Sequence, residues 1–226
     1  MAKNGFIRYA SLLVIYAIAF LAGLFVYDLL EGENVLLKFL LMDITSTIVI
    51  FIFSVLLKNS SIYDPYWSVL PQVMVIVLAL DGVKFHWTSY IMIVLVELWG
   101  LRLTLNCLIR FKSLKQEDWR YINLKEKHPK LWPLINLGGI HLFPTFVVYL
   151  LMLPTVAYFE AVNNGLMTND FSLSSILAII ISVLGILFEL IADIQSSYYR
   201  KKYPNQILDK GLWKRSRHPN YFGEII

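Results

Sequence analysis

The sequence predicts an all-α, polytopic transmembrane helical bundle of about six spans plus the start of a further C-terminal helix. Of its 226 residues, 58% are hydrophobic and only 16% are charged, and the mean hydropathy is +0.62. A soluble domain of this size could not bury so much apolar surface. Several apolar runs approach or exceed the roughly 18 to 20 residues that cross a bilayer. No linker divides the chain, so we expect residues 1–226 to form a single membrane domain.

Six apolar runs define the spans in order along the chain. The first begins at Phe6 and continues past Arg8 to about Leu30, which is too long for a cleaved signal peptide. The third is short enough to be tilted, broken or partly re-entrant. The predicted spans are residues 6–28, 35–57, 67–80, 87–108, 140–159 and 173–192.

The charges beside these spans predict their orientation. Lys3 and Arg8 lie at the start of the first span, whereas acidic residues dominate the loop after it. Seven Lys or Arg residues lie between 110 and 130, none between 160 and 170, and seven between 200 and 217. Because basic loops stay in the cytosol, the N-terminus and the C-terminal motif are expected to be cytosolic, in a bacterial inner membrane or the endoplasmic reticulum. The net charge of +4 therefore indicates membrane lipids rather than nucleic acid as partners.

Residues 110–139 connect the fourth and fifth spans and are both charged and aromatic. We expect this segment to lie on the cytosolic side at the level of the lipid headgroups. The single cysteine, Cys107, excludes an internal disulfide, and the histidines are scattered without metal-ligand spacing. No metal site is predicted.

Ionisable residues inside the spans need a structural or functional reason, because burying charge in a bilayer is costly. Asp43 is either functional or a structural partner of neighbouring hydroxyl groups. Glu97 and Arg102 are five residues apart, which separates them by about 140° around a helix and predicts different partners. Glu97 is a candidate proton donor. Arg102 is a candidate clamp for an anion or carboxylate, or it snorkels toward the headgroups.

Glu189, Asp193 and Arg200 are spaced by four and then seven residues, so they lie along one face of the helix that leaves the sixth span. Carboxylates suit ribose hydroxyl groups and an arginine suits phosphate. This face is therefore a candidate nucleotide site, although a solvated helix end has the same pattern.

The strongest local motif is G-L-W-K-R-S-R-H-P-N-Y-F-G-E at residues 211–224. Its basic residues precede a His218–Pro219 turn, after which a helix is expected to begin, capped by Asn220. A diphosphate would suit the basic residues and the helix N-terminus. Gly223 would permit a close backbone approach, and Glu224 would point into the bundle. The alternative is that these basic residues only flank a membrane span and set its orientation. The sequence stops in the first turn of this apolar helix, so we expect a truncated C-terminus.

With these motifs, the chain resembles the DUF1295 branch of the membrane steroid 5-alpha-reductase and sterol-reductase superfamily, which is related to isoprenylcysteine carboxyl methyltransferase-like proteins. The resemblance includes D-P-Y-W at 64–67, L-W-G-L-R-L at 98–103, E-D-W-R-Y at 117–121 and F-E-L-I-A-D-I-Q at 188–195. It implies reduction of a carbon–carbon double bond in a lipophilic, steroid- or lipid-like enone by NADPH, with residues 193–224 as a cytosolic cofactor-binding segment. The implied cofactor-binding residues are Glu189, Asp193, Arg200, Arg217, His218, Asn220, Tyr221, Glu224, Arg102, Asp118 and Arg120.

The resemblance also requires a donor for the carbonyl oxygen, where negative charge develops during hydride transfer. Steroid reductases use a Glu and Tyr pair, but the position nearest to that tyrosine here is Trp99, and an indole N–H is a poorer acid than a phenol. Glu97, Asp64 and Tyr66 are therefore the candidate catalytic residues.

Two other functions stay open. Membrane methyltransferases that use S-adenosylmethionine carry a similar R-H-P-x-Y-x-G turn, although several basic residues favour the more negatively charged NADPH. A transporter or structural membrane subunit is the non-enzymatic alternative. No sign of two related halves, which many transporters have, is detectable in the sequence.

Overall fold

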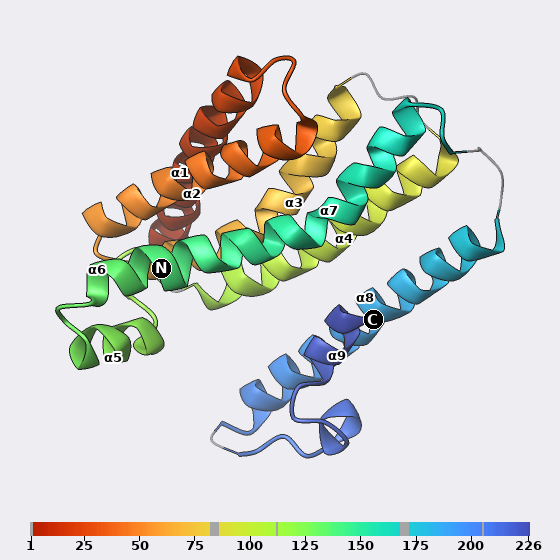
Figure 1. Cartoon of the computed structure of the whole chain (residues 1–226). Coiled ribbons are helices and arrows are strands. Elements are labelled where there is room, and N and C mark those ends of the chain that lie inside the picture. The colour runs from red at the N-terminus through yellow and green to blue at the C-terminus, as the bar shows by residue number, and fades with distance from the viewer. Residues whose placement is uncertain (1, 82–85, 112, 168–171, 205) are drawn as a thin grey trace.

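The computed structural model describes residues 2–81, 86–111, 113–167, 172–204 and 206–226, which form helices and connecting turns without strands (Figure 1). The long helices are α1 (Ala2–Leu29), α2 (Val35–Leu56), α3 (Tyr63–Leu80), α4 (Trp87–Arg110), α7 (Phe143–Asn163) and α8 (Leu173–Lys202). The shorter elements are η1 (Ser60–Ile62), α5 (Trp119–Lys127), α6 (Trp132–Leu134), the π-helical η2 (Ile135–Leu142), η3 (Gly211–Lys214) and α9 (Pro219–Ile225).

Six helical segments are long and apolar enough to cross a membrane, which confirms the predicted fold class. The third is longer than expected, because η1 and α3 together extend over Ser60–Leu80. Asp64 and Pro65 look like the end of a loop in the sequence. Both are nevertheless suited to the first turn of a helix, where the missing proline N–H is harmless and a carboxylate is favourable.

Two buried clusters hold the first spans and α7 together. One contains Phe39, Met74 and Phe159 from α2, α3 and α7. The other places Tyr16 of α1 against Tyr66 of α3. These clusters pack α1, α2, α3 and α7 into one bundle, which positions the residues on its surface.

Helices α8 and α9 lie together beside α4, along one side of this bundle (Figure 1). Much of α8 carries exposed apolar side chains, among them Leu184 and Ile194. Such a surface suits contact with lipid chains. The helix therefore meets the bundle mainly through the polar residues that α4 presents.

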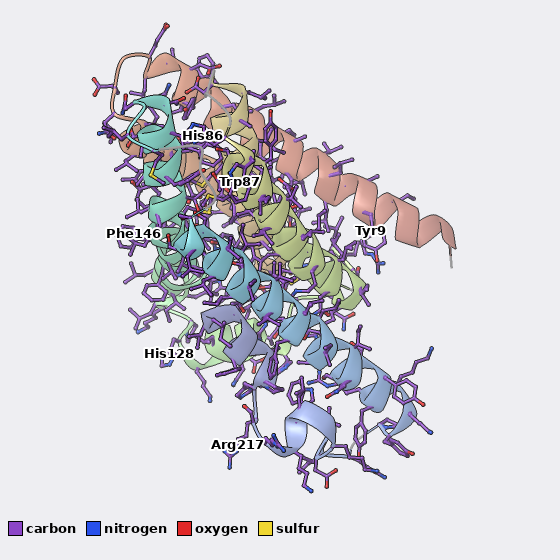
Figure 2. All side chains as sticks on the ribbon, turned by 90° about the vertical axis from the view of Figure 1, so that its right-hand side faces the viewer. Tyr9, His86, Trp87, His128, Phe146 and Arg217 are labelled. Atoms are coloured by element: carbon purple, nitrogen blue, oxygen red, sulfur yellow. The ribbon has the colours of Figure 1, made fainter. Side chains whose placement is uncertain are left out.

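Both basic segments lie toward one end of the molecule. In Figure 2, His128 after α5 and Arg217 after η3 lie toward the end opposite to His86 and Trp87. The charge pattern predicts that both basic segments lie on the same side of the membrane, and their common placement agrees with this. That this side is the cytosolic one is a prediction. Residues 168–171, at the end of the loop that lacks Lys and Arg, lie outside the described residues.

Candidate functional site

An ionic cluster joins α4 to α8, and we call Arg102, Asn106, Glu189 and Asp193 the Arg102 cluster. The Arg102 guanidinium group binds the carboxylates of both Glu189 and Asp193, the latter at 2.6 Å. The side-chain amide of Asn106, one turn after Arg102, donates a 2.9 Å hydrogen bond to Asp193. The side chains of Arg102 and Glu189 are 10% and 1% exposed. This is a buried charge network, and losing one partner from it would be costly.

The cluster retains polar atoms that have no partner among the described residues. These are Nε of Arg102 and Oε1 of Glu189, both buried, and α9, which packs on α8, adds the buried and unpartnered Oδ1 of Asn220. Buried polar groups are normally hydrogen-bonded, so such orphans need an explanation. One donor and two acceptors suit a ligand rich in hydroxyl and amide groups.

Two glycines, Gly185 on α8 and Gly223 on α9, allow the two helices to pack closely. A Cβ atom on Gly223 would lie 2.6 Å from Glu189 Cγ, and one on Gly185 would lie 2.8 Å from the Gly223 carbonyl oxygen. The helices approach closely enough to bring Glu224 near Arg102 and Asp193. Burial raises the pKa of Glu224, with Arg102 opposing this shift and Asp193 adding to it. The region therefore gathers three carboxyl groups around one guanidinium group.

A second feature is an open pocket of about 400 Å³ between α3, α5, α7 and α9, which we call the apolar pocket. Its α7 wall includes Phe143 and Leu151, which are 66% and 67% exposed and so belong to the outer, lipid-facing surface of the bundle. Its lining residues are Tyr63, Asp64, Trp67, Arg120, Tyr121, Ile140, Phe143, Pro144, Val147, Val148, Leu151 and Glu224.

The polar wall of the apolar pocket is a carboxyl–phenol pair. The Tyr121 hydroxyl group donates a 2.6 Å hydrogen bond to Asp64 Oδ1. Burial, and then the Asp64 charge, raise the pKa of Tyr121, so this phenol keeps its proton at physiological pH. Beside it, Arg120 forms a two-bond pair with Asp118, at 2.9 and 3.1 Å, which lowers the pKa of Asp118.

Short contacts fix α5 against the start of α3. The Asp118 carboxylate caps α5 by accepting from the Arg120 backbone N–H, while the Asp118 N–H donates to Ser61 Oγ at 2.8 Å. The Ser60 N–H in turn donates to the Glu117 carboxylate, also at 2.8 Å. Tyr121 is thus held over Asp64 by backbone contacts rather than by its own hydrogen bond alone.

Glu224 connects the two regions. It lines the apolar pocket and also a smaller pocket of about 210 Å³, whose wall includes Trp99, Gly185 and Glu189. A molecule in the apolar pocket would therefore lie next to one bound at the Arg102 cluster. Such neighbouring sites suit a reaction between a lipophilic substrate and a polar cofactor.

The sequence pattern of DUF1295, a family described as protein of unknown function, matches residues 50–226. The chain belongs to the DUF1295 family. An uncharacterized protein of Schizosaccharomyces pombe (strain 972), C594.04c, is 27% identical over 76% of this chain and 56% of that relative. The chain thus spans little more than half of the relative's length. No solved structure matches it. The DUF1295 match includes both pockets and the Arg102 cluster but not Asp43.

In this DUF1295 chain, the predicted cofactor-binding residues fall into three groups. Arg102, Glu189, Asp193 and Glu224 come together as described above, while Asp118 and Arg120 lie at the apolar pocket. Four of the remaining residues are exposed on α8, in α9 or just before it: Arg200, Arg217, His218 and Tyr221. His218 is stacked on Tyr221, with ring centroids 5.1 Å apart. The last, Asn220, is half-buried in α9. The predicted stripe on α8 is therefore split, with two buried carboxylates and an exposed arginine.

One local prediction is wrong and another is made more specific. Asn220 does not cap α9, because the helix already begins at Pro219 and His218 occupies the N-cap position without a side-chain hydrogen bond. Gly223 does permit a close backbone approach, as predicted, and the element that approaches it is α8 at Gly185 and Glu189.

The candidate proton donors are also separated. Asp64 lines the apolar pocket. Tyr66 is fully buried among other aromatic rings and lines neither pocket, which argues against the predicted donor role. Glu97 is half-buried on α4 and also lines neither pocket, whereas Trp99 lines the smaller one.

Sequence reasoning did not select Tyr121 or Asn106 as site residues. Tyr121 ends the E-D-W-R-Y motif, and only the folding of α5 onto α3 shows that it meets Asp64. Asn106 had a usable signal, since it lies four residues after Arg102 and therefore on the same face of α4.

Proposed function

We propose that this chain is a membrane-embedded, NADPH-dependent reductase of the steroid 5-alpha-reductase-like type, which reduces a carbon–carbon double bond conjugated to a carbonyl group in a lipophilic substrate. One observation carries the proposal. A hydrogen-bonded Tyr121–Asp64 pair lies in the wall of an apolar pocket that shares Glu224 with the smaller pocket, which Glu189 of the Arg102 cluster also lines. A phenol in that position can donate to a carbonyl oxygen as negative charge develops there.

Each side chain has a defined task in this reaction. Trp67 and the α7 residues of the apolar pocket hold the lipophilic substrate and exclude water. Tyr121 donates its proton to the carbonyl oxygen of the substrate. Asp64, when protonated, can donate to the Tyr121 oxygen and so restore the phenol. The pair therefore supplies the proton that accompanies the hydride.

The Arg102 cluster fits the cofactor. The unpartnered Oε1 of Glu189 and Oδ1 of Asn220 can accept from ribose hydroxyl or carboxamide groups, and Arg102 Nε can donate. The exposed basic residues before α9 suit the phosphate groups: Lys214, Arg215 and Arg217. When bound, NADPH supplies the hydride, while the protein contributes orientation and electrostatics.

A second candidate, an S-adenosylmethionine-dependent methyltransferase, is favoured by one specific feature. The carboxyl groups of Glu189, Asp193 and Glu224 outnumber the single guanidinium group of Arg102. Excess negative charge suits a sulfonium cofactor better than a phosphate-rich one.

The test is binding of NADPH and S-adenosylmethionine, measured side by side on the purified chain in lipid nanodiscs. We expect saturable NADPH binding, and Asp193→Asn should weaken it. The control is Asp81→Asn, which changes a carboxyl group that accepts a hydrogen bond from Tyr27 on α1. This control should bind NADPH as the unchanged chain does. Binding of S-adenosylmethionine alone would favour the second candidate. Binding of neither would remove both enzymatic proposals for this chain.

A further inference from the structure

The interior of the bundle holds a cluster of side-chain oxygen atoms that the proposed reaction does not use. Asp43 and Thr47 on α2 are both fully buried. The Thr47 hydroxyl group lies 2.8 Å from that of Thr145 on α7, which lies 2.7 Å from that of Tyr63 on α3. Tyr66 directs its hydroxyl group toward Thr47 and Ser46. Three helices thus bring side-chain oxygen atoms together in one buried region, which we call the Asp43 cluster: Asp43, Ser46, Thr47, Tyr63, Tyr66 and Thr145.

Oδ2 of Asp43 has no hydrogen-bond partner among the described residues. The hydroxyl oxygen of Tyr66 faces Thr47 and Ser46 but forms no well-aligned hydrogen bond there, and both side chains are fully buried. The contact between Asp43 Oδ1 and Thr47 Oγ1 is long for a hydrogen bond, at 3.5 Å. It does match two neighbouring ligands at right angles around a cation bound at about 2.3–2.6 Å, the range for oxygen ligands of Ca²⁺. The spacing of these two oxygen atoms is therefore compatible with ligands of one shared cation.

The charge balance leads to the same conclusion. No Lys or Arg forms an ion pair with Asp43 in the described part of the chain, where the ion pairs involve Arg102 and Arg120. A buried carboxylate without a compensating charge is strongly unfavourable, especially within a bilayer. A carboxylate with several hydroxyl groups is an oxygen-only set, which suits hard cations. A single negative charge balances a monovalent cation.

We infer that the Asp43 cluster is an intramembrane binding site for a monovalent alkali-metal cation, such as Na⁺. Asp43 supplies the charge, and the hydroxyl groups of Thr47 and Tyr66 complete the ligand set. The bound ion ties α2, α3 and α7 together. The site is independent of the proposed reaction, although Tyr63 contributes to the Asp43 cluster and also lines the apolar pocket.

The experiment measures the melting temperature of the purified chain in nanodiscs as NaCl replaces choline chloride at constant ionic strength. A ligand that binds only the folded state raises this temperature in a saturable manner. We expect a rise of a few degrees with Na⁺ and no response to choline, whose charged nitrogen is covered by methyl groups and cannot be coordinated by oxygen ligands. Asp43→Asn should abolish the response, and Tyr66→Phe should shift its midpoint several-fold upward. Asp81→Asn, which removes a carboxyl group at the end of α3, should respond as the unchanged chain does.

Equal melting temperatures of the unchanged chain in NaCl, KCl and choline chloride would overturn the inference and indicate a neutral Asp43. An Asp43→Asn variant that still responds to Na⁺ would also overturn it. If that variant does not fold, the unchanged chain and Tyr66→Phe decide the question. None of these results bears on NADPH binding.

Discussion

The hydroxyl group of Tyr121 donates a 2.6 Å hydrogen bond to Oδ1 of Asp64, although 57 positions separate the two residues. Neither residue belongs to the buried clusters of the bundle. The pair instead lies in the wall of the apolar pocket, where α5 is held to the start of α3. This placement makes the pair the centre of the proposed chemistry.

Replacing the phenol tests that role. We expect Tyr121→Phe to lower kcat for enone reduction by about 10²–10⁴-fold, the usual contribution of a general acid. NADPH affinity should be unchanged, because the proposed cofactor site is the Arg102 cluster and not the Tyr121–Asp64 pair. Tyr9→Phe, which removes a hydroxyl group bound to the Leu108 carbonyl oxygen on another side of the molecule, is the matched control. An unchanged kcat in Tyr121→Phe would exclude this tyrosine as the donor.

Asp64→Asn separates positioning from proton supply. An asparagine oxygen can still accept from Tyr121, so the ring should stay in place, but the side chain cannot pass a proton to the phenol. The expected result is a loss of kcat with KM nearly unchanged. A rise in KM at constant kcat would instead assign Asp64 to substrate binding.

Arg102→Leu should destabilise the folded chain by about 3 kcal/mol, because it leaves two buried carboxyl groups without their partner. Thermal unfolding in detergent measures this loss. The triple variant with Glu189→Gln and Asp193→Asn should regain part of it, since the remaining groups are neutral. Unfolding at the same temperature as the unchanged chain would show that the Arg102 cluster does not hold α8 to α4.

Gly223→Ala should separate α9 from α8, because the added methyl group would lie 2.6 Å from Glu189 Cγ. Such overpacking costs about 1–3 kcal/mol locally. We expect faster proteolysis between residues 203 and 218 and weaker cofactor binding. Gly138→Ala is the control, since nothing lies within 4 Å of a Cβ atom there. Equal proteolysis of the two variants would contradict the close α8–α9 contact.

The raised pKa of Glu224 gives a pH dependence with a defined sign. The folded state holds this proton more tightly than the unfolded chain does. The contribution of Glu224 to stability is therefore greatest below its ordinary pKa of 4.5 and declines as the pH rises through the raised value. Neighbouring groups partly desolvate the carboxyl group, but the residue keeps exposed surface, so we expect a small effect. The unchanged chain should melt at a progressively lower temperature than Glu224→Gln as the pH rises. If the unchanged chain instead became more stable than Glu224→Gln as the pH rises, the raised pKa of Glu224 would be contradicted.

Hydropathy was sufficient to predict the fold class and the approximate spans, because backbone polar groups in lipid must be satisfied within helices. Hydropathy placed the start of the third span too late, at residue 67. Asp64 and Pro65 have low hydropathy, but both suit the first turn of a helix. Local sequence also indicated that Glu189 and Asp193 share one face.

What local sequence could not predict was which helices meet. That Arg102 of α4 binds both carboxylates of α8, and that Tyr121 reaches Asp64, depends on contacts between segments far apart in the chain. Asn220 shows the same limit at short range, because a side chain suited to capping lies just inside the helix when a proline precedes it.

The most direct measurement is a single turnover with NADPH deuterated at its transferable position and a lipophilic enone, using the purified chain in nanodiscs. The account predicts a reduced product that carries deuterium at the β-carbon, formed by the unchanged chain and by Tyr9→Phe but at a strongly reduced rate by Tyr121→Phe. A product without deuterium, or no reduction of any enone by a chain that binds NADPH, would contradict the account.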